Sequence, residues 1–285
     1  MSNSVFRIFT GLAAFAFFTA CNKNLPGIPA YVKVDEAQLS VSAGQGSASS
    51  NINAVWLSSG STDFGIYEIP NISDTTMCVA PVLLSGNHMF LLQAVIKQNG
   101  IAATRAVYPF YLPDTAWLDL AELDTAEINP VFKYKPSTVF AMNEDFETGN
   151  AFGDMTRCTN AGEVFEGSGC GKISLNNTTD SVIESKMIAG IGIPVTANTY
   201  LELNYRNPGQ GFKLNFEAVN GSDIIRSEII TITARDYWNK IYIDLSSAIG
   251  QLSGTETYKF YLTASLTDGM SSSNIYIDNF KVVHF

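Results

Sequence analysis

The chain has 285 residues, of which 46% are hydrophobic and 15% charged. This length allows two domains of ordinary size, and this composition excludes an intrinsically disordered protein. The formal net charge of −10 at pH 7 argues against a nucleic-acid partner and against docking on anionic lipid, because both rely on clustered Lys and Arg.

The N-terminal segment "MSNSVFRIFTGLAAFAFFTAC" predicts export. One basic residue, Arg7, precedes an apolar run that ends at Ala20. The run is shorter than the ~20 residues that a membrane-spanning helix needs, and it has the length of the apolar part of a signal peptide.

The end of this segment, Phe18-Thr19-Ala20-Cys21, resembles the lipobox of bacterial lipoproteins, although that family usually has Leu where this chain has Phe18. The resemblance implies that residues 1–20 are a signal peptide and that Cys21 becomes an acylated N-terminus. Residues 21–28 would then be the tether to the outer membrane. An ordinary secretory signal, cleaved near Cys21, is the alternative. The residues after Cys21, "NKNLPG", lack the acidic run that marks surface export in some lipoproteins of this kind, which favours the periplasmic side.

The strand-like segments within residues 29–135 predict five or six strands, and hence a small β-sandwich. The strand-like segments are "AYVKVDEAQLSV", "INAVWLSS", "FGIYEIP", "APVLLSGNHMFLLQAVIKQNG" and "VYPFY". They resemble Ig-like or PEGA-like modules of cell-envelope proteins. Three stretches are also similar to the N-terminal part of Bacteroidota outer-membrane lipoproteins of unknown function: 28–31, 65–70 and 104–111. The acidic stretch "TAWLDLAELDTAEINP" is expected to link this domain to a second one.

Residues 136–285 also read as strands, because apolar and polar residues alternate. In "KLNFEAV", for example, Leu214 and Phe216 alternate with Lys213 and Asn215, so one face of the strand is buried. Helical periodicity is confined to a short turn near "LSSAIG". The block opens with "NEDFETGNAFGDM" and closes with "NIYIDNFKVVHF". This framing resembles jelly-roll domains of the carbohydrate-binding-module and galactose-binding-like type. The expected fold is therefore all-β, a small sandwich followed by a jelly roll.

The jelly-roll resemblance implies a structural calcium ion where the first and last strands meet. The matching residues are Glu147 and Asp278, helped by Asp145. Calcium binds carboxylate and backbone carbonyl oxygens, so the donor types are suitable. The alternation of apolar residues changes phase at Asp278 and Asn279, which predicts a β-bulge there. The alternative is that the acids only cap strand ends.

Aromatic residues are the candidates for a glycan site, because sugar rings expose C–H faces that stack on flat side chains. Tyr242, Tyr261 and Tyr276 lie on the faces of their strands opposite the apolar ones. Tyrosine suits positions that are partly exposed to solvent, because it combines an apolar ring with a polar hydroxyl. Arg206 and Asn207 in "NYRNPG" would complete a polar–aromatic patch. Exposed tyrosines are also common in sheets without any ligand.

Three tryptophans, Trp56, Trp117 and Trp238, leave two alternatives open. Each could stack on a sugar, but a tryptophan next to a strand is more often part of a core.

Cys158 and Cys170 flank "TNAGEVFEGSG", a segment that can turn back and bring them together. An exported compartment permits a disulfide between them, although spacing alone does not fix connectivity. The chain has no CxxC motif and no Cys/His cluster, so a zinc site is not expected.

No catalytic constellation is found in the sequence. A glycosidase needs two facing carboxylates, whereas Glu163 and Glu166 are expected on opposite faces of a strand. The sequence therefore predicts a lipid-anchored envelope protein without catalysis, whose jelly roll binds a glycan or another extracellular polymer. The alternative is an accessory subunit of an outer-membrane protein complex.

Overall fold

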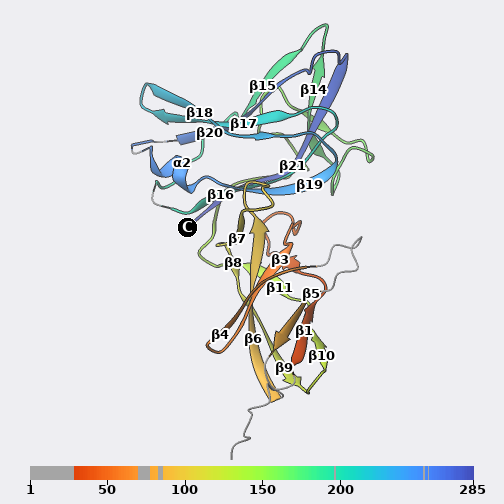
Figure 1. The fold of residues 1–285 in the computed structure, drawn as a ribbon. Coiled ribbons are helices and arrows are strands. Elements are labelled where there is room, and N and C mark those ends of the chain that lie inside the picture. The colour runs from red at the N-terminus through yellow and green to blue at the C-terminus, as the bar shows by residue number, and fades with distance from the viewer. Residues whose placement is uncertain (1–28, 70–77, 83–85, 196, 253, 256) are drawn as a thin grey trace, which may run out of the picture.

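The computed structural model describes residues 29–285, apart from 70–77, 83–85, 196, 253 and 256 (Figure 1). Almost all regular structure in these residues is β-strand, with one helix of a single turn, α2 (Ser246–Gly250), so the prediction of an all-β protein is confirmed. The helix lies at "LSSAIG", where the sequence predicts it. The described helix is too short to cross a membrane.

We call residues 29–135 the first half, and its described residues form three sheets (Figure 1). The first sheet has the order β10 (Thr125–Glu127), β1 (Ala30–Val34), β5 (Cys78–Val82). The second has the order β2 (Gln38–Ser40), β11 (Val131–Tyr134), β8 (Tyr111–Leu112). The third contains β4 (Thr62–Glu68), β3 (Ala54–Ser59), β6 (Gly86–Lys97) and β7 (Arg105–Val107), with β9 (Asp114–Leu120) also paired to β6.

The acidic stretch that was expected to be a linker forms strands of the first half instead. Residues 114–120 pair with β6 as β9, and residues 125–127 run parallel to β1 as β10. The physical reason is alternation within the stretch: Ala116, Leu118 and Leu120 turn towards the core, while Trp117 and Asp119 face outwards.

Two sheets form a jelly-roll sandwich from residues 136–285, the second half. One sheet, here the large sheet, has the order β13 (Thr156–Cys158), β14 (Cys170–Asn176), β21 (Ser272–His284), β16 (Thr199–Asn207), β19 (Arg235–Asp244), with β12 (Val139–Glu144) also paired to β21. The other, here the small sheet, has the order β15 (Val182–Lys186), β20 (Thr257–Ser265), β17 (Phe212–Asn220), β18 (Asp223–Ile232).

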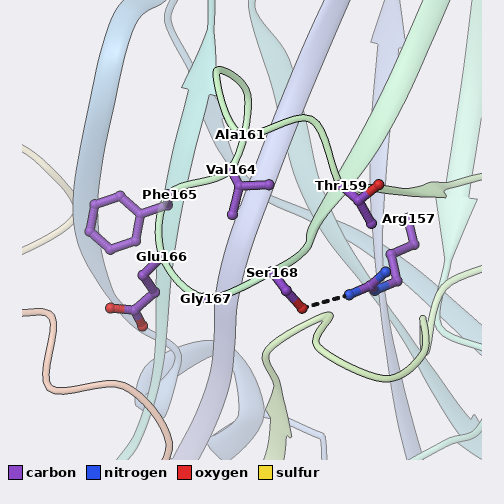
Figure 2. A pocket seen from close by; sticks show the side chains of 8 residues that line it. All are labelled: Arg157, Thr159, Ala161, Val164, Phe165, Glu166, Gly167 and Ser168. Atoms are coloured by element: carbon purple, nitrogen blue, oxygen red, sulfur yellow. Dashed lines mark hydrogen bonds between the residues drawn. The ribbon is translucent and has the colours of Figure 1, made fainter.

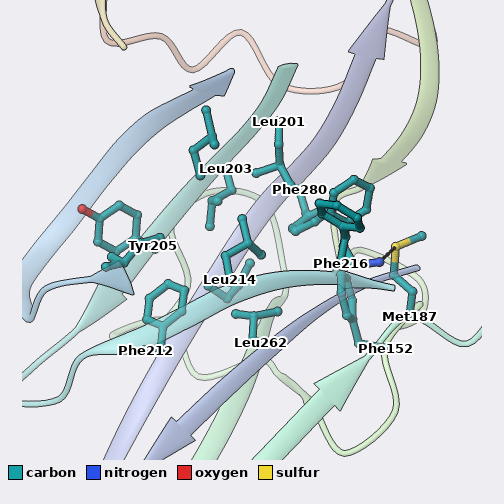
Figure 3. Close-up of a cluster of buried hydrophobic side chains, with 14 of the residues drawn as sticks. Phe152, Met187, Leu201, Leu203, Tyr205, Phe212, Leu214, Phe216, Leu262 and Phe280 are labelled. Carbon is teal, nitrogen blue, oxygen red and sulfur yellow. Dashed lines mark hydrogen bonds between the residues drawn. The ribbon is translucent and has the colours of Figure 1, made fainter. Parts of the chain in front are cut away.

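The core of the second half lies between these two sheets (Figure 3). The small sheet contributes Leu214 and Phe216 from β17 and Leu262 from β20, and the large sheet contributes Leu201 and Leu203 from β16. These are the positions that the period-two alternation predicts. The same alternation turns the intervening residues of the large sheet to its outer face, where the functional site is built.

The predicted bulge near Asp278 is confirmed. The pairing of β16 with β21 shifts register between Glu202 and Asn204, opposite this position, and Asn279 adopts a φ of +50°. Asn tolerates the left-handed region better than most residues. As a result Phe280 and Val282 stay in the core although the strand has gained a residue.

The first half docks on the outer face of the large sheet (Figure 1). Tyr200, Tyr242 and Val283 of that face belong to the hydrophobic cluster of the first half. Backbone contacts join the halves as well: the N–H of Asn99 donates to the carbonyl of Tyr242 at 2.8 Å, and the backbone at Gln98 bridges to Tyr242. The two halves are therefore packed against one another.

Glu202 is the buried charge at the centre of this contact, with no exposed side-chain surface. Its Oε1 accepts hydrogen bonds from the hydroxyls of Tyr108 (2.6 Å) and Tyr134 (2.8 Å) of the first half. Its Oε2 lies 3.1 Å from Nζ of Lys240, which is also buried. Burial opposes the charged form, but Lys240, Lys281 and the two hydroxyls together hold the pKa of Glu202 below its usual value.

Candidate functional site: a loop pocket on the large sheet

The loop between β13 and β14, residues 159–169, lies over the part of the large sheet that the first half leaves free. Its glycines fit the turns it makes: Gly167 has a φ of +67°, and a Cβ at Gly169 would meet the carbonyl oxygen of Phe146 at 2.4 Å. The N–H of Glu163 donates to the carbonyl of Asn160 at 2.8 Å, which closes a turn in the loop. The sequence therefore builds a compact loop here and not a strand.

The loop and the neighbouring strand line an open pocket of about 500 Å³, within the size range of small-ligand sites (Figure 2). It is lined by Arg157, Thr159, Ala161, Val164, Phe165, Glu166, Gly167 and Ser168. Figure 2 shows Arg157 joined to Ser168 on one side of the pocket and Phe165 beside Glu166 on the other. The lining combines hydroxyl, guanidinium and carboxylate groups with one aromatic ring.

Arg157 is held in place by the chain around it. Its guanidinium donates to the carbonyl oxygens of Phe146 and Glu147 and to Oγ of Ser168. Ser168 in turn donates its hydroxyl to Oε2 of Glu147 at 2.6 Å. Because these partners fix the polar wall before any ligand arrives, the cost of ordering it on binding is small.

Glu163 ties the loop to the sheet beneath. Its carboxylate accepts hydrogen bonds from the thiol of Cys158 (2.9 Å), the hydroxyl of Tyr276 and the ammonium of Lys172 (3.0 Å). These bonds, with that of Cys158 first, lower the pKa of Glu163 to about 2. Nη1 of Arg206 adds a bond of 3.1 Å to the carbonyl of Gly162.

An aromatic group supports the apolar side of the pocket. The ring of Phe165 lies 5.4 Å from that of Trp238, which lies 6.4 Å from the ring of Tyr276. The cations of Arg206 and Lys172 lie over Tyr276, 5.4 Å and 5.3 Å from its ring centre. Phe165 is thus backed by other rings, at centroid distances typical of aromatic pairs.

The structure brings together only two of the five predicted ligand-binding residues. Arg206 and Tyr276 are directly opposite each other on β16 and β21, beside the pocket. Tyr242 is 1% exposed in the contact between the halves, so the first half covers the face that a sugar would need. Tyr261 lies on the small sheet with the guanidinium of Arg226 5.7 Å from its ring centre. Asn207 is fully buried, where its amide donates to the carbonyls of Gln210 and Thr233.

Sequence reasoning missed Arg157, Phe165 and Ser168, and it placed Glu163 and Glu166 on a strand. The sequence signal for a loop was present, since "TNAGEVFEGSG" has three glycines and an Asn within eleven residues. That these loop residues would enclose a pocket is a property of their tertiary contacts.

Two of the predicted calcium ligands, Glu147 and Asp145, accept hydrogen bonds from the protein in this structure. Both carboxylate oxygens of Glu147 accept bonds from Ser168, and Oδ1 of Asp145 accepts the N–H of Glu147. The carbonyls of Phe146 and Glu147 accept hydrogen bonds from the guanidinium of Arg157. Among the described residues, no three His, Cys, Asp or Glu lie close enough to hold a metal ion.

Asp278 is the predicted calcium ligand that is buried with an oxygen lacking a partner. It is 1% exposed, and its Oδ2 has no hydrogen-bond partner. Burial raises the pKa of Asp278 to about 7.

Cys158 and Cys170 are directly opposite on the antiparallel strands β13 and β14. Both are thiols in this structure, with Cys170 buried. Burial raises the pKa of Cys170 to about 12. Cys21, the predicted lipid attachment site, lies outside the described residues.

No protein-family model and no curated protein sequence matches this chain. Among solved structures, it is similar to a carbohydrate-binding module of the β-sandwich superfamily, with 14% identity and a TM-score of 0.41 over 90% of this chain and 98% of that one. It is also similar to the CBM22-1 xylan-binding domain of Xyn10C from Paenibacillus barcinonensis, with 13% identity and a TM-score of 0.39 over 53% of this chain and 97% of that one. A third is the family 11 carbohydrate-binding module from Clostridium thermocellum, in complex with a β-1,3-1,4-mixed-linked tetrasaccharide: 16% identity, TM-score 0.35, 49% of this chain and 92% of that one. Likenesses of this size carry no conclusion about a ligand, and the class that the geometry defines is a β-sandwich protein with a loop pocket.

Proposed function

We propose that this protein is a lipid-anchored, non-catalytic protein of the cell envelope that binds a glycan chain in the loop pocket of its second half. The observation that carries the proposal is the pocket itself, with prearranged polar groups on one side and a backed aromatic ring on the other. A sugar offers both hydroxyl groups and an apolar C–H face, which match these two sides.

The roles of the pocket residues follow from their positions. Arg157 has five N–H donors and uses three of them within the protein, so further donors remain for sugar hydroxyls. Glu166 is exposed at the rim and accepts hydrogen bonds from hydroxyls. Phe165 supplies the stacking surface.

A glycan array probed with the full-length protein in mild detergent, followed by titration calorimetry of the best ligand, tests this function. Replacing Phe165 with Ala should weaken binding about tenfold, equal to ~1.4 kcal/mol. Glu166→Gln should weaken it less, and Glu228→Gln, on the small sheet, should leave it unchanged. Equal affinity of the wild type and the Phe165→Ala variant for the glycan would refute the assignment of the glycan site to the loop pocket.

Lipid anchoring at Cys21 is the second part of the proposal and rests on the sequence Phe18-Thr19-Ala20-Cys21. It places the protein at the outer membrane, on the periplasmic side. Labelled palmitate should be incorporated into the wild type and not into a Cys21→Ala variant. An unlabelled wild type would indicate an ordinary secretory signal.

An accessory subunit of an outer-membrane complex is the second candidate. Ile224 and Ile225, 58% and 51% exposed near the start of β18, favour it: they lie on opposite faces of the strand, and each leaves a large apolar side chain in solvent that a protein contact would cover. A partner present in equal amount after detergent extraction, and lost with Ile224→Asp, would support this candidate.

A further inference from the structure

The outer face of the third sheet of the first half carries two tryptophans in a row of exposed residues. β6 is the central strand: Met89 is directly opposite Trp117 of β9, and Gln93 is opposite Trp56 of β3. Trp56 is in turn opposite Ile66 of β4. Leu91 lies between Met89 and Gln93 on the same face. We call this surface the tryptophan face: Trp56, Ile66, Met89, Leu91, Gln93 and Trp117 (the strands are visible in Figure 1).

Large apolar side chains on this face are exposed to solvent. Trp117 is 67% exposed, Met89 42% and Ile66 39%. A single exposed apolar residue needs no explanation, whereas several on adjacent strands mark a contact surface. The inward side of the same strands supplies the core through Phe90 and Leu92, so these outward residues are not needed for it.

Neutral hydrogen-bonding groups are interleaved with the apolar ones. Leu91 is flanked by Ser58 on β3 and by Thr115 on β9, each directly opposite it on the same face. Gln93 places its amide beside Trp56. Two exposed carboxylates lie on the same face: Asp63 is directly opposite Ser58, and Asp119, opposite Asn87, follows Trp117 by two residues on β9. They repel a polyanion and can accept hydrogen bonds from hydroxyl groups. The surface therefore complements a ligand that has no negative charge and carries both hydroxyls and apolar faces.

The indole of Trp56 is fixed on the surface, because its Nε1–H donates to Oδ1 of Asp63 on β4. A ring that is already fixed loses little conformational entropy when a ligand stacks on it. Trp56 and Trp117 are separated by two strand spacings and by the four residues from Met89 to Gln93, which corresponds to roughly 17 Å between their Cα atoms. Two stacking positions at this separation fit an extended chain better than a single small molecule.

We propose that the tryptophan face is a second carbohydrate-binding surface, on which a neutral polysaccharide chain stacks diagonally from Trp117 to Trp56. It shares no residue with the loop pocket and does not rest on the function proposed for it. If both surfaces engage one polymer, the second contact forms at a high effective concentration, and the chain binds a polymer more tightly than either surface alone would.

The test is native electrophoresis of the full-length protein through gels that contain xylan, mixed-linkage β-glucan or β-1,4-galactan. At least one polymer should retard the wild type. The double variant Trp56→Ala/Trp117→Ala should show at least a tenfold higher dissociation constant for that polymer. Tyr237→Ala is the matched control, because Tyr237 is an exposed aromatic residue of the second half, 60% exposed. It should stay within twofold of the wild type.

A second measurement keeps the face intact, in case the double variant folds poorly. The chain has three tryptophans, so in a Trp238→Phe variant all indole emission comes from Trp56 and Trp117. The polymer should shift this emission. In the complementary variant Trp56→Phe/Trp117→Phe, all indole emission comes from Trp238, beside the pocket.

The two reporters separate the two surfaces. If the polymer shifts the emission of Trp56 and Trp117 but not that of Trp238, the result supports the tryptophan face and counts against the pocket. If it shifts the emission of Trp238 alone, the tryptophan face is overturned. Lack of retardation of the wild type by all three polymers, or equal retardation of the double variant, also overturns it. The proposal is also overturned if a protein co-purifies and must be removed before the emission of Trp56 and Trp117 responds to the polymer, because the surface would then be a protein interface.

Discussion

The hydroxyl of Tyr108, in the first half, donates a 2.6 Å hydrogen bond to the fully buried carboxylate of Glu202, in the second half. The two residues are 94 positions apart in the sequence. Buried charges persist only when they are paired and hydrogen-bonded, and Glu202 is both, through Tyr108, Tyr134 and Lys240. The halves consequently depend on each other for the satisfaction of polar groups as well as for apolar packing.

Glu202→Gln should destabilise the protein by ~3–5 kcal/mol, because it leaves the ammonium of Lys240 buried without a counter-charge. Tyr108→Phe removes one hydrogen bond to a charged group and should cost ~1.5–3 kcal/mol. Urea denaturation measures both. The matched control is Glu228→Gln, which breaks the exposed 2.7 Å pair with Lys213 and should cost ~1 kcal/mol or less. Equal effects of Glu202→Gln and Glu228→Gln would contradict the buried contact.

Acid should weaken the protein through Glu163. Its pKa is about 2 in the folded chain and ~4.3 when unfolded, so its contribution is present above pH 4 and is lost as the pH falls through 2. At ~1.4 kcal/mol per pKa unit the contribution is at most about 3 kcal/mol at neutral pH, and it applies to the reduced protein, in which the thiol of Cys158 donates to Glu163. Urea denaturation of the reduced protein should give a stability gap between wild type and Glu163→Gln that shrinks from pH 6 towards pH 2. Glu166→Gln, in the same loop, serves as the control. If the difference in stability between wild type and Glu163→Gln does not change with pH, Glu163 is not the source of the acid sensitivity.

Cys158 and Cys170 should form a disulfide in the exported protein. Directly paired residues of antiparallel strands have Cα atoms ~4.5–5.5 Å apart, which is within the range that a disulfide spans. Alkylation of the native protein followed by non-reducing peptide mapping should find the two peptides linked. Closing a loop of this size stabilises by ~3 kcal/mol, so the Cys158→Ser/Cys170→Ser variant should melt earlier. Two alkylated cysteines in protein taken directly from the envelope would show that the thiol form is the native one.

Calcium should leave the melting temperature unchanged. A ligand that binds the folded state raises its stability, but here Glu147 and the nearby carbonyls are already occupied by Ser168 and Arg157. Scanning calorimetry with calcium and with a chelator should give the same transition, whereas Arg157→Ala should lower it. If calcium raises the transition in the wild type and not in Asp278→Asn, the sequence-based prediction of a structural calcium is right and the arrangement described here is that of the metal-free protein.

The strands, the β-bulge and the short helix follow from local sequence, and they could be predicted. In β17 the alternation correctly assigns Leu214 and Phe216 to the core, and in β21 the change of phase correctly locates the irregularity at Asp278 and Asn279. These features depend on which face of a single strand is apolar. That information is contained in a few consecutive residues.

The burial of Tyr242 could not be predicted in the same way. The alternation correctly turns it away from the core of the sandwich, to the side where an exposed ring would serve a ligand. It is covered by Tyr108 and Tyr111, more than 130 positions earlier, because the first half docks there. Trp117 shows the opposite case. In an acidic stretch assigned to a linker, it is an exposed strand residue, since the pairing of β9 with β6 is a long-range contact.

Hydrogen exchange of the full-length protein, with and without its best-binding glycan, tests the proposed glycan site most directly. We expect slower exchange of the amides of residues 157–168 in the presence of the glycan, and loss of this protection in Phe165→Ala. Exchange in the small sheet, for example in β18, should not change. Binding that leaves residues 157–168 unprotected would contradict the assignment of the glycan site to this loop.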